Sequence, residues 1–293
     1  MSRLPSAPEL HCSRYRFREH PVSDSIAAYL NLTGAGVPGI APSLDTLARL
    51  QRGHIQAIPF ENLNPLAGLP VSLEIPALVK KVTERRGGYC FEHNTLYRHA
   101  LATLGFQATP LLARVRMTAP PDVVTPRTHM LLLVEIDGER FISDTGFGKM
   151  TPTAPLRLVA DTVQHTPHGR YRLASLGDEW RLEAEVDGDW LHLYVFDLRP
   201  AYPVDFEMSN WYVSTHPVSH FTRDLIAVRT VDEGRHVLHN TRYSFQPSEL
   251  PAERRELVSG EQIAQVLEDT FGLAASDVPG LAAKLDGIAR RPA

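Results

Sequence analysis

The sequence of 293 residues is poor in cysteine and has no excess of basic residues. Each shortage argues against a class of protein or a kind of partner. Two cysteines, Cys12 and Cys90, are too few for a disulfide framework. They favour a reducing, cytoplasmic setting, in which a free thiol stays usable. The formal net charge is −4, whereas nucleic acids and anionic membranes attract proteins rich in Lys and Arg. We therefore expect neither nucleic acid nor a membrane as a partner.

Long apolar runs and nucleotide-binding motifs are also missing from the sequence. No apolar run reaches the ~18 residues of a membrane helix. Residues 1–22 lack the apolar stretch of a secretory signal, and we expect them to form a loosely packed N-terminal extension. No P-loop or G-x-G-x-x-G motif lies at a predicted strand–helix junction, so nucleotide hydrolysis and dinucleotide binding have no support.

Three regions of different texture follow the extension. Residues 23–106 are mainly helical in pattern, residues 107–208 carry short strand patterns that suggest a barrel or a sandwich, and residues 209–293 mix strands with helices. The expected helices are 24–30, 43 to 54 or 57, 75–84, one that starts near Cys90, 261–271 and 278–288. The expected strands are 107–117, 129–136, 140–144, 169–174, 180–185, 191–196, 225–231, 235–238 and 241–245. The fold class is therefore α+β.

Cys90 follows a glycine pair, residues 87–88, and stands at the start of a helical pattern. Gly105 is placed to end that helix in a left-handed conformation. The first turn of a helix favours negative charge, and two arginines, residues 85–86, precede the glycines. We therefore expect Cys90 to have a lowered pKa and to act as a nucleophile. The apolar stripe of this helix is Tyr97, Ala100, Leu101 and Leu104.

A cysteine nucleophile needs a base and a group that orients the base. The Asp-Gly pair at 137–138 is a strong signal for a two-residue hairpin turn. Such a turn places Leu131 opposite Asp144, and His129 points to the same face as Leu131. The sequence therefore predicts a His129–Asp144 pair. A three-residue turn would place the two side chains on opposite faces instead.

Several alternatives compete with this interpretation. Cys90 could be an inert thiol, and Asp144 could be an ordinary turn residue. His93 lies one helical turn beyond Cys90 and could serve as its base, but no carboxylate is obviously placed to orient it. We expect no metal site, because Cys90 has neither a second cysteine nearby nor a His-x₃-His pattern beside it.

The segment 86–94, RGGYCFEHN, resembles the RGGxCxExN signature of arylamine N-acetyltransferases. Further segments resemble motifs of this family in the same order, and the resemblance covers about residues 23–242. They are IPFENL at 58–63, ARV at 113–115, RTH at 127–129, DTGFG at 144–148, and the bacterial-type segments 205–207 and 210–215. The DTGFG segment departs slightly from the family pattern, because Thr145 stands where many relatives have Val or Ala.

The resemblance implies a cysteine-protease-like Cys-His-Asp triad, which carries over to Cys90, His129 and Asp144. It also implies a helical N-terminal domain, a β-barrel middle domain and an α/β lid. The family reaction is ping-pong: the cysteine takes an acetyl group from acetyl-CoA and passes it to an arylamine, an arylhydrazine or an N-arylhydroxylamine. Acetyl-CoA is thus the expected cosubstrate, and a small aromatic amine or hydrazine is the expected acceptor.

Other residues receive roles that follow from the proposed chemistry. Phe60, Tyr89 and Phe147 could form an aromatic slot for the acceptor ring, whereas Phe91 fits core packing equally well. Thr125 and Arg127 match the region in which relatives contact CoA. The backbone N–H of Cys90 is a candidate oxyanion-hole donor. Arg86 is expected to pair with Glu61 and so to fix the loop that carries Cys90.

There are three rival functions, of which two use the same three residues for catalysis and one does not. An amide synthase of the same family would release and cyclise a polyketide chain. A hydrolase or a transglutaminase-like enzyme would pass the acyl group to water or to a peptide amine. A non-enzymatic protein would bind CoA or a xenobiotic without using Cys90, His129 and Asp144.

Overall fold

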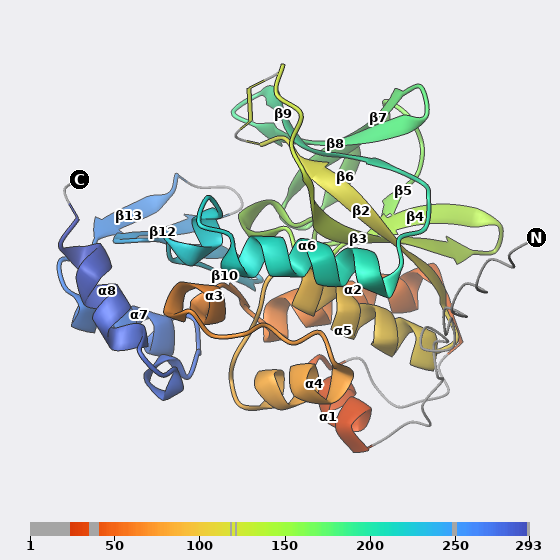
Figure 1. The fold of residues 1–293 in the computed structure, drawn as a ribbon. Helices are drawn as coiled ribbons and strands as arrows, with labels where there is room; N and C mark the ends of the chain where they lie inside the picture. The colour runs from red at the N-terminus through yellow and green to blue at the C-terminus, as the bar shows by residue number, and fades with distance from the viewer. Residues whose placement is uncertain (1–23, 35–40, 118, 121, 248–250, 292–293) are drawn as a thin grey trace, which may run out of the picture.

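The structure, a computed structural model, describes residues 24–34, 41–117, 119–120, 122–247 and 251–291. A helical first part is followed by a barrel-like sheet and then by a third part that combines strands with helices (Figure 1). The mixed α+β fold predicted from the sequence is confirmed at this level. The expected N-terminal extension, residues 1–22, lies outside the described residues.

The first part consists of helices whose ends match local capping signals. Ser43 accepts a hydrogen bond from the backbone N–H of Thr46 and so caps the second helix. The fifth helix ends before Gly105, whose φ is +84°, and the N–H of Phe106 donates back to the carbonyl of Leu101. The helices are α1 (Asp24–Leu32), α2 (Leu44–Ala57), α3 (Leu63–Ala67), α4 (Ile75–Thr83) and α5 (Cys90–Thr103).

The second part is an eight-stranded antiparallel sheet in the order β5-β4-β3-β2-β9-β8-β7-β6. The chain after β5 bonds to both ends of this order: Leu158 donates to Arg140 on β4, and Asp161 donates to Leu173 on β7. The sheet is therefore nearly closed. Its strands are β2 (Gln107–Val115), β3 (Arg127–Ile136), β4 (Glu139–Ser143), β5 (Leu156–Arg157), β6 (Gln164–Thr166), β7 (Gly169–Leu176), β8 (Glu179–Val186) and β9 (Asp189–Asp197).

Strand β3 is buried on both faces, which explains its unbroken apolar sequence. Met130, Leu132 and Val134 pack into the core of the helical part. Leu131 packs into the separate core inside the barrel, with Leu133 against it. Because α5 packs against β2 and β3, residues at the start of α5 lie beside residues at the start of β3.

The third part contains a second sheet, in the order β1-β10-β11-β12-β13, and a third apolar core. Its edge strand β1 (Phe60–Glu61) comes from the helical part and pairs with β10. Phe60 of β1 also pairs with Gly88, so this sheet, with the helices α7 and α8 packed on it, lies against the segment that precedes Cys90. The elements are α6 (Pro203–Thr215), β10 (Ile226–Val231), β11 (Gly234–His239), β12 (Arg242–Pro247), β13 (Glu253–Glu256), α7 (Gly260–Asp269) and α8 (Leu281–Ala289), with 3₁₀ turns at Gly148–Met150, His220–Thr222 and Ala275–Asp277.

The elements β1, α3, α6, β5, β6 and β13 are absent from the sequence-based prediction. Five of them are five residues or shorter, too short for a periodic signal. In α6 the apolar pattern is misleading, because Met208 and Trp211 are 67% and 64% exposed. The expected domain boundary between residues 208 and 209 lies inside α6, and the division into domains stays a prediction.

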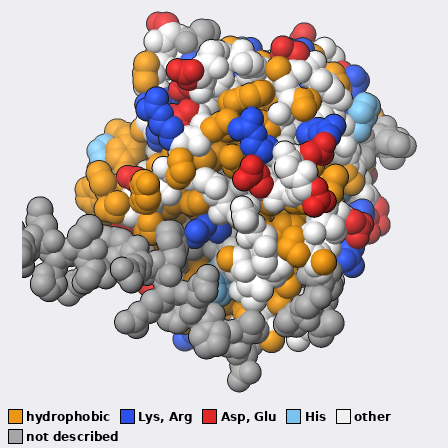
Figure 2. Space-filling view, turned by 90° about the vertical axis from the view of Figure 1, so that its right-hand side faces the viewer, with side chains coloured by type: hydrophobic (Ala, Val, Ile, Leu, Met, Phe, Trp, Pro, Cys, Tyr) orange, Lys and Arg blue, Asp and Glu red, His pale blue; other side chains and the backbone are white. Residues whose placement is uncertain are grey.

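Two surface features complete the description. On the face drawn in Figure 2, basic and acidic side chains are interspersed among apolar ones, so no large area of one charge forms there. Within the described ranges, no helix is both long enough and apolar enough to cross a membrane.

Candidate active site

Cys90 is the first residue of α5, as the sequence predicted, and Tyr89 caps the helix in an extended conformation. The two glycines before it have no room for a side chain: the backbone of Pro59 lies against Gly87, and the side chain of Glu92 lies against Gly88. A Cβ atom on Gly87 would lie 1.8 Å from the carbonyl oxygen of Pro59, and one on Gly88 would lie 2.6 Å from Oε2 of Glu92. The glycine pair therefore seats the Cys90 loop tightly against β1 and α5.

The hairpin of β3 and β4 has the register predicted from the sequence. Asp137 and Gly138 both have positive φ, 51° and 78°, as a two-residue type I′ turn requires. The ladder runs from the pair Ile136–Glu139 to the pair Leu132–Ser143. Asp144 follows directly, and its Oδ2 lies 2.7 Å from Nε2 of His129.

The carboxylate of Asp144 is buried and fully bonded. Oδ2 also accepts from the hydroxyl of Tyr194 at 3.0 Å, and Oδ1 accepts from the side chain of Asn94 at 3.0 Å and from the N–H of Gly146 at 2.8 Å. Burial alone would raise the pKa of Asp144, but His129 and these hydrogen bonds bring it below its ordinary value. The carboxylate therefore stays ionised and holds the imidazole in place.

Asn94 and Tyr194 are site residues that the sequence analysis missed. Asn94 joins three segments, because its amide nitrogen also donates to the carbonyl of Met130 and its oxygen accepts from the N–H of Thr145. Its place one helical turn after Cys90, inside the recognised motif, was an available signal. Tyr194 carries no local signal, because only the pairing of β9 with β2 and β8 brings it to this position.

The thiol of Cys90 lies against the start of β3. Cys90 is 5% exposed, and Sγ lies 3.5 Å from the carbonyl oxygen of Thr128, the residue before His129. A Cβ atom on Gly146 would lie 2.7 Å from Cα of Cys90, so the loop after β4 also touches this helix. Cys90 thus lies beside the start of the strand that carries His129, and His129 bonds Asp144. The joint use of these three residues as a catalytic triad stays a prediction.

The expectation of a lowered pKa for Cys90 is wrong for this structure. Burial raises the pKa of the thiol to about 12, and backbone groups of Met130 and Phe91 offset this only in part. Asp144 and Glu92 raise it further, while Arg86 pairs with Glu61 instead of facing the sulfur. The thiol therefore needs a neighbouring base to lose its proton at neutral pH.

His93, the alternative base, is occupied elsewhere. It is buried, and its Nδ1 lies 2.7 Å from Nε2 of His54, whose Nδ1 in turn bonds the hydroxyl of Tyr29. Burial lowers the pKa of His93 to about 4, so the ring is neutral at pH 7. Its contacts include a stack on Phe60 but no ion pair with a carboxylate among the residues that the structure describes.

The predicted aromatic residues divide into two groups. Phe147 is half-buried and meets the rings of His129 and Tyr194 edge-on, each at 4.8 Å between centroids. Phe60 is also half-buried and stacks on His93. Tyr89 and Phe91 are fully buried, so both rings are core side chains in this structure. A substrate contact of Tyr89 stays a prediction.

Thr125 and Arg127 form contacts that hold the segment at the start of β3 in place. The hydroxyl of Thr125 donates to the carbonyl of Val115 at 2.8 Å, and Arg127 pairs with Asp197 at 2.6 Å. Their contact with a cofactor stays a prediction. The expected pair of Arg86 and Glu61 is confirmed, with Nη2 2.8 Å from Oε1. No group of three or more potential metal ligands occurs in the described part of the chain.

Comparison with known proteins finds relatives that cover most of the chain. The N-acetyltransferase family matches residues 43–278. An arylamine N-acetyltransferase of Escherichia coli is 39% identical over 88% of this chain and 90% of its own length. The structure of Mycobacterium marinum arylamine N-acetyltransferase superposes with a TM-score of 0.86 at 39% identity, covering 90% of this chain and 99% of the other. The same bacterium's enzyme in complex with CoA gives a TM-score of 0.85 at 39% identity, covering 89% and 98%.

Proposed function

The chain belongs to the arylamine N-acetyltransferase family of acyltransferase enzymes, and we propose that it acetylates arylamines, arylhydrazines and N-arylhydroxylamines from acetyl-CoA through an acetyl thioester on Cys90. The observation that carries the proposal is the position of the Cys90 thiol, beside the buried His129–Asp144 pair. The relatives are named for arylamine acetylation, which does not favour amide synthesis or hydrolysis.

In the first half-reaction His129 accepts the proton of Cys90 while the sulfur attacks the thioester carbonyl of acetyl-CoA. The new S–C bond gives a tetrahedral intermediate. Its collapse re-forms the carbonyl and breaks the C–S bond to CoA, which leaves as a thiolate and takes the proton from His129. Asp144 orients the ring through Nε2 and stabilises its charge. The backbone N–H of Cys90, at the start of α5, is a candidate donor to the oxyanion.

In the second half-reaction the acceptor nitrogen attacks the acetyl carbonyl and loses a proton to His129. The C–S bond breaks, and the sulfur of Cys90 is reprotonated. Arylamines are neutral near pH 7 and can attack directly. Because burial raises the pKa of Cys90, proton removal by His129 is needed in the first half and proton return is favourable in the second.

Substrate positions follow from the half-buried groups around the thiol. The rings of Phe60 and Phe147 would contact an aromatic acceptor. Acetyl-CoA would contact Thr125, in the loop before β3, and Arg127, the first residue of β3 and two residues before His129. The CoA complex of the M. marinum neighbour supports the use of a CoA cosubstrate.

Initial-rate kinetics test the proposal. With acetyl-CoA and an aniline or hydrazine both varied, we expect parallel double-reciprocal lines, because CoA leaves before the acceptor binds. Intersecting lines would contradict the thioester intermediate. CoA release that continues without an amine would instead favour a hydrolase.

A further inference from the structure

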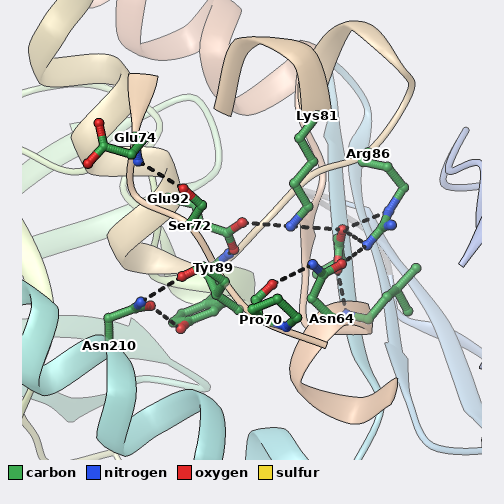
Figure 3. Close-up of polar contacts among 12 residues, drawn as sticks. Asn64, Pro70, Ser72, Glu74, Lys81, Arg86, Tyr89, Glu92 and Asn210 are labelled. Carbon is green, nitrogen blue, oxygen red and sulfur yellow. Dashed lines mark hydrogen bonds and ion pairs between the residues drawn. The ribbon is translucent and has the colours of Figure 1, made fainter. Parts of the chain in front are cut away.

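Two basic and two acidic side chains form a buried series of ion pairs at the start of the helix that carries Cys90: Arg86, Glu61, Lys81 and Glu92. Figure 3 shows the side chains of Lys81 and Glu92 pointing toward each other. The four side chains come from the loop before α5, from β1, from α4 and from α5. Nζ of Lys81 lies 2.6 Å from Glu92 and 3.7 Å from Glu61, and Arg86 lies 2.8 Å from Glu61. None of these side chains is more than 15% exposed. Lys81 therefore bridges two buried carboxylates.

Each carboxylate directs its other oxygen to a backbone amide. Oε2 of Glu61 accepts from the N–H of Leu63 at 2.5 Å, and Oε2 of Glu92 accepts from the N–H of Tyr89 at 3.0 Å. Tyr89 is the cap of α5 and the immediate neighbour of Cys90. Glu92 therefore anchors the backbone next to the nucleophile.

The two carboxylates are unequally neutralised. Burial would raise the pKa of Glu61, but Lys81 and Arg86 bring it down to about 2. In the described part of the chain Glu92 forms an ion pair with Lys81 alone, and it also faces the negative charge of Glu61. Burial keeps the pKa of Glu92 above its ordinary value in spite of Lys81. Lys81 is thus the cation on which the ionised form of Glu92 depends.

The negative charge of Glu92 acts on the reacting thiol, because it raises the pKa of Cys90, as Asp144 does. Within the described residues, Lys81 is the only cation that contacts Glu92 and can offset this charge. An uncompensated Glu92 would therefore either oppose the thiolate or take up a proton and hold Tyr89 less firmly.

We propose that Lys81 is a positioning residue for acyl transfer: it neutralises Glu92, so that Tyr89 is anchored without adding net negative charge beside Cys90. The role in turnover rests on the proposed function, whereas the effect on the thiol does not. Lys81 touches no reacting atom and acts through Glu92.

The test compares Lys81→Met with the wild type in two assays. The first follows alkylation of Cys90 by iodoacetamide against pH, read as the mass of the Cys90 peptide. The second measures kcat and KM with acetyl-CoA. We expect alkylation and kcat at pH 7 to fall about tenfold, the alkylation profile to move up by about one pH unit, and KM for acetyl-CoA to stay unchanged. Lys81→Arg keeps the charge and should restore both rates.

Two further variants make the test specific. Lys80→Met removes the exposed neighbouring cation on α4 and should leave the profile unchanged. In Glu92→Gln the amide oxygen still accepts from Tyr89, so the double variant Lys81→Met, Glu92→Gln should return to the rates of Glu92→Gln alone. Lys81→Met rates equal to those of Lys80→Met, or a double variant as slow as Lys81→Met, would overturn the proposal.

The two proposals fail in different ways. If wild-type Cys90 takes no acetyl group from acetyl-CoA, the proposed function is wrong. The alkylation profiles still test whether Lys81 affects the thiol of Cys90, because that assay needs no acetyl-CoA. If Lys81→Met does not fold, Lys81→Gln takes its place and is judged by the same outcomes.

Discussion

At the scale of single residues, Asp144 is the best-defined group of the site. Its carboxylate accepts four hydrogen bonds, from His129, Tyr194, Asn94 and Gly146, and the side chain is buried away from solvent. Such a carboxylate does not need to accept the proton to contribute. It fixes the imidazole tautomer and stabilises the imidazolium that forms.

Replacing Asp144 by Asn keeps the shape but presents an N–H or a neutral oxygen to His129. We expect kcat to fall on the order of 10³-fold with the fold retained, since the ring loses both orientation and charge stabilisation. Steady-state kinetics and circular dichroism measure the two parts. Tyr194→Phe, which removes one of the four hydrogen bonds, should cost about tenfold or less. Equal losses in the two variants would argue against a special role for the His129–Asp144 contact.

The raised pKa of Cys90 leads to a prediction for His129. In His129→Gln the buried thiol keeps its proton at neutral pH, because its pKa of about 12 lies far above 7. We expect alkylation of Cys90 at pH 7 to slow ~100-fold or more and to recover as the pH rises toward the thiol pKa. Alkylation at the wild-type rate would mean that another group takes the proton.

At the scale of elements, the site depends on the contact between the loop after β4 and the start of α5. Gly146→Ala would place a Cβ atom 2.7 Å from Cα of Cys90. We expect this change to destabilise the protein by ~1–3 kcal/mol and to lower kcat. Gly287→Ala is the matched control, because a Cβ atom in the middle of α8 meets nothing within 4 Å. It should stabilise the protein by about 0.5–1 kcal/mol. Thermal unfolding of both variants decides, and a Gly146→Ala protein as stable as the wild type would refute the packing argument.

The elements that carry the site were predictable because their signals are local. The turn at 137–138 fixes the β3–β4 register, and this register brings His129 to Asp144. The motif before α5 places Cys90 at the helix start. The prediction of a lowered thiol pKa was wrong because burial, which raises the pKa of Cys90, outweighs the expected effects of the helix start and the two arginines. Tyr194 could not be found from the sequence, since its position follows from sheet closure.

At the scale of the whole molecule, the described residues form three apolar cores, and the protein also buries several polar groups. His54 and His93 form one such group, between α2 and α5. Burial lowers the pKa of both, that of His93 to about 4. The unfolded chain binds protons at these histidines below about pH 6.5, whereas the folded chain does not. Folding stability therefore decreases as the pH falls from 6.5 toward 4.

His93→Gln removes one of these titrating groups. Its free energy of unfolding should depend less steeply on pH between 6.5 and 4.5, by up to about 1.4 kcal/mol per pH unit. Urea denaturation at several pH values measures the slope for the variant and the wild type. Identical slopes would show that His93 does not remain neutral in the folded protein.

The acetyl-thioester mechanism is tested first by intact mass after mixing the protein with acetyl-CoA in the absence of an acceptor. We expect the gain of one acetyl group at Cys90, its loss on addition of an aniline or hydrazine, and no gain in Cys90→Ser, which retains Cys12. An unmodified protein whose Cys90 still reacts with iodoacetamide would contradict the acetyl-thioester mechanism and point to a different acyl donor.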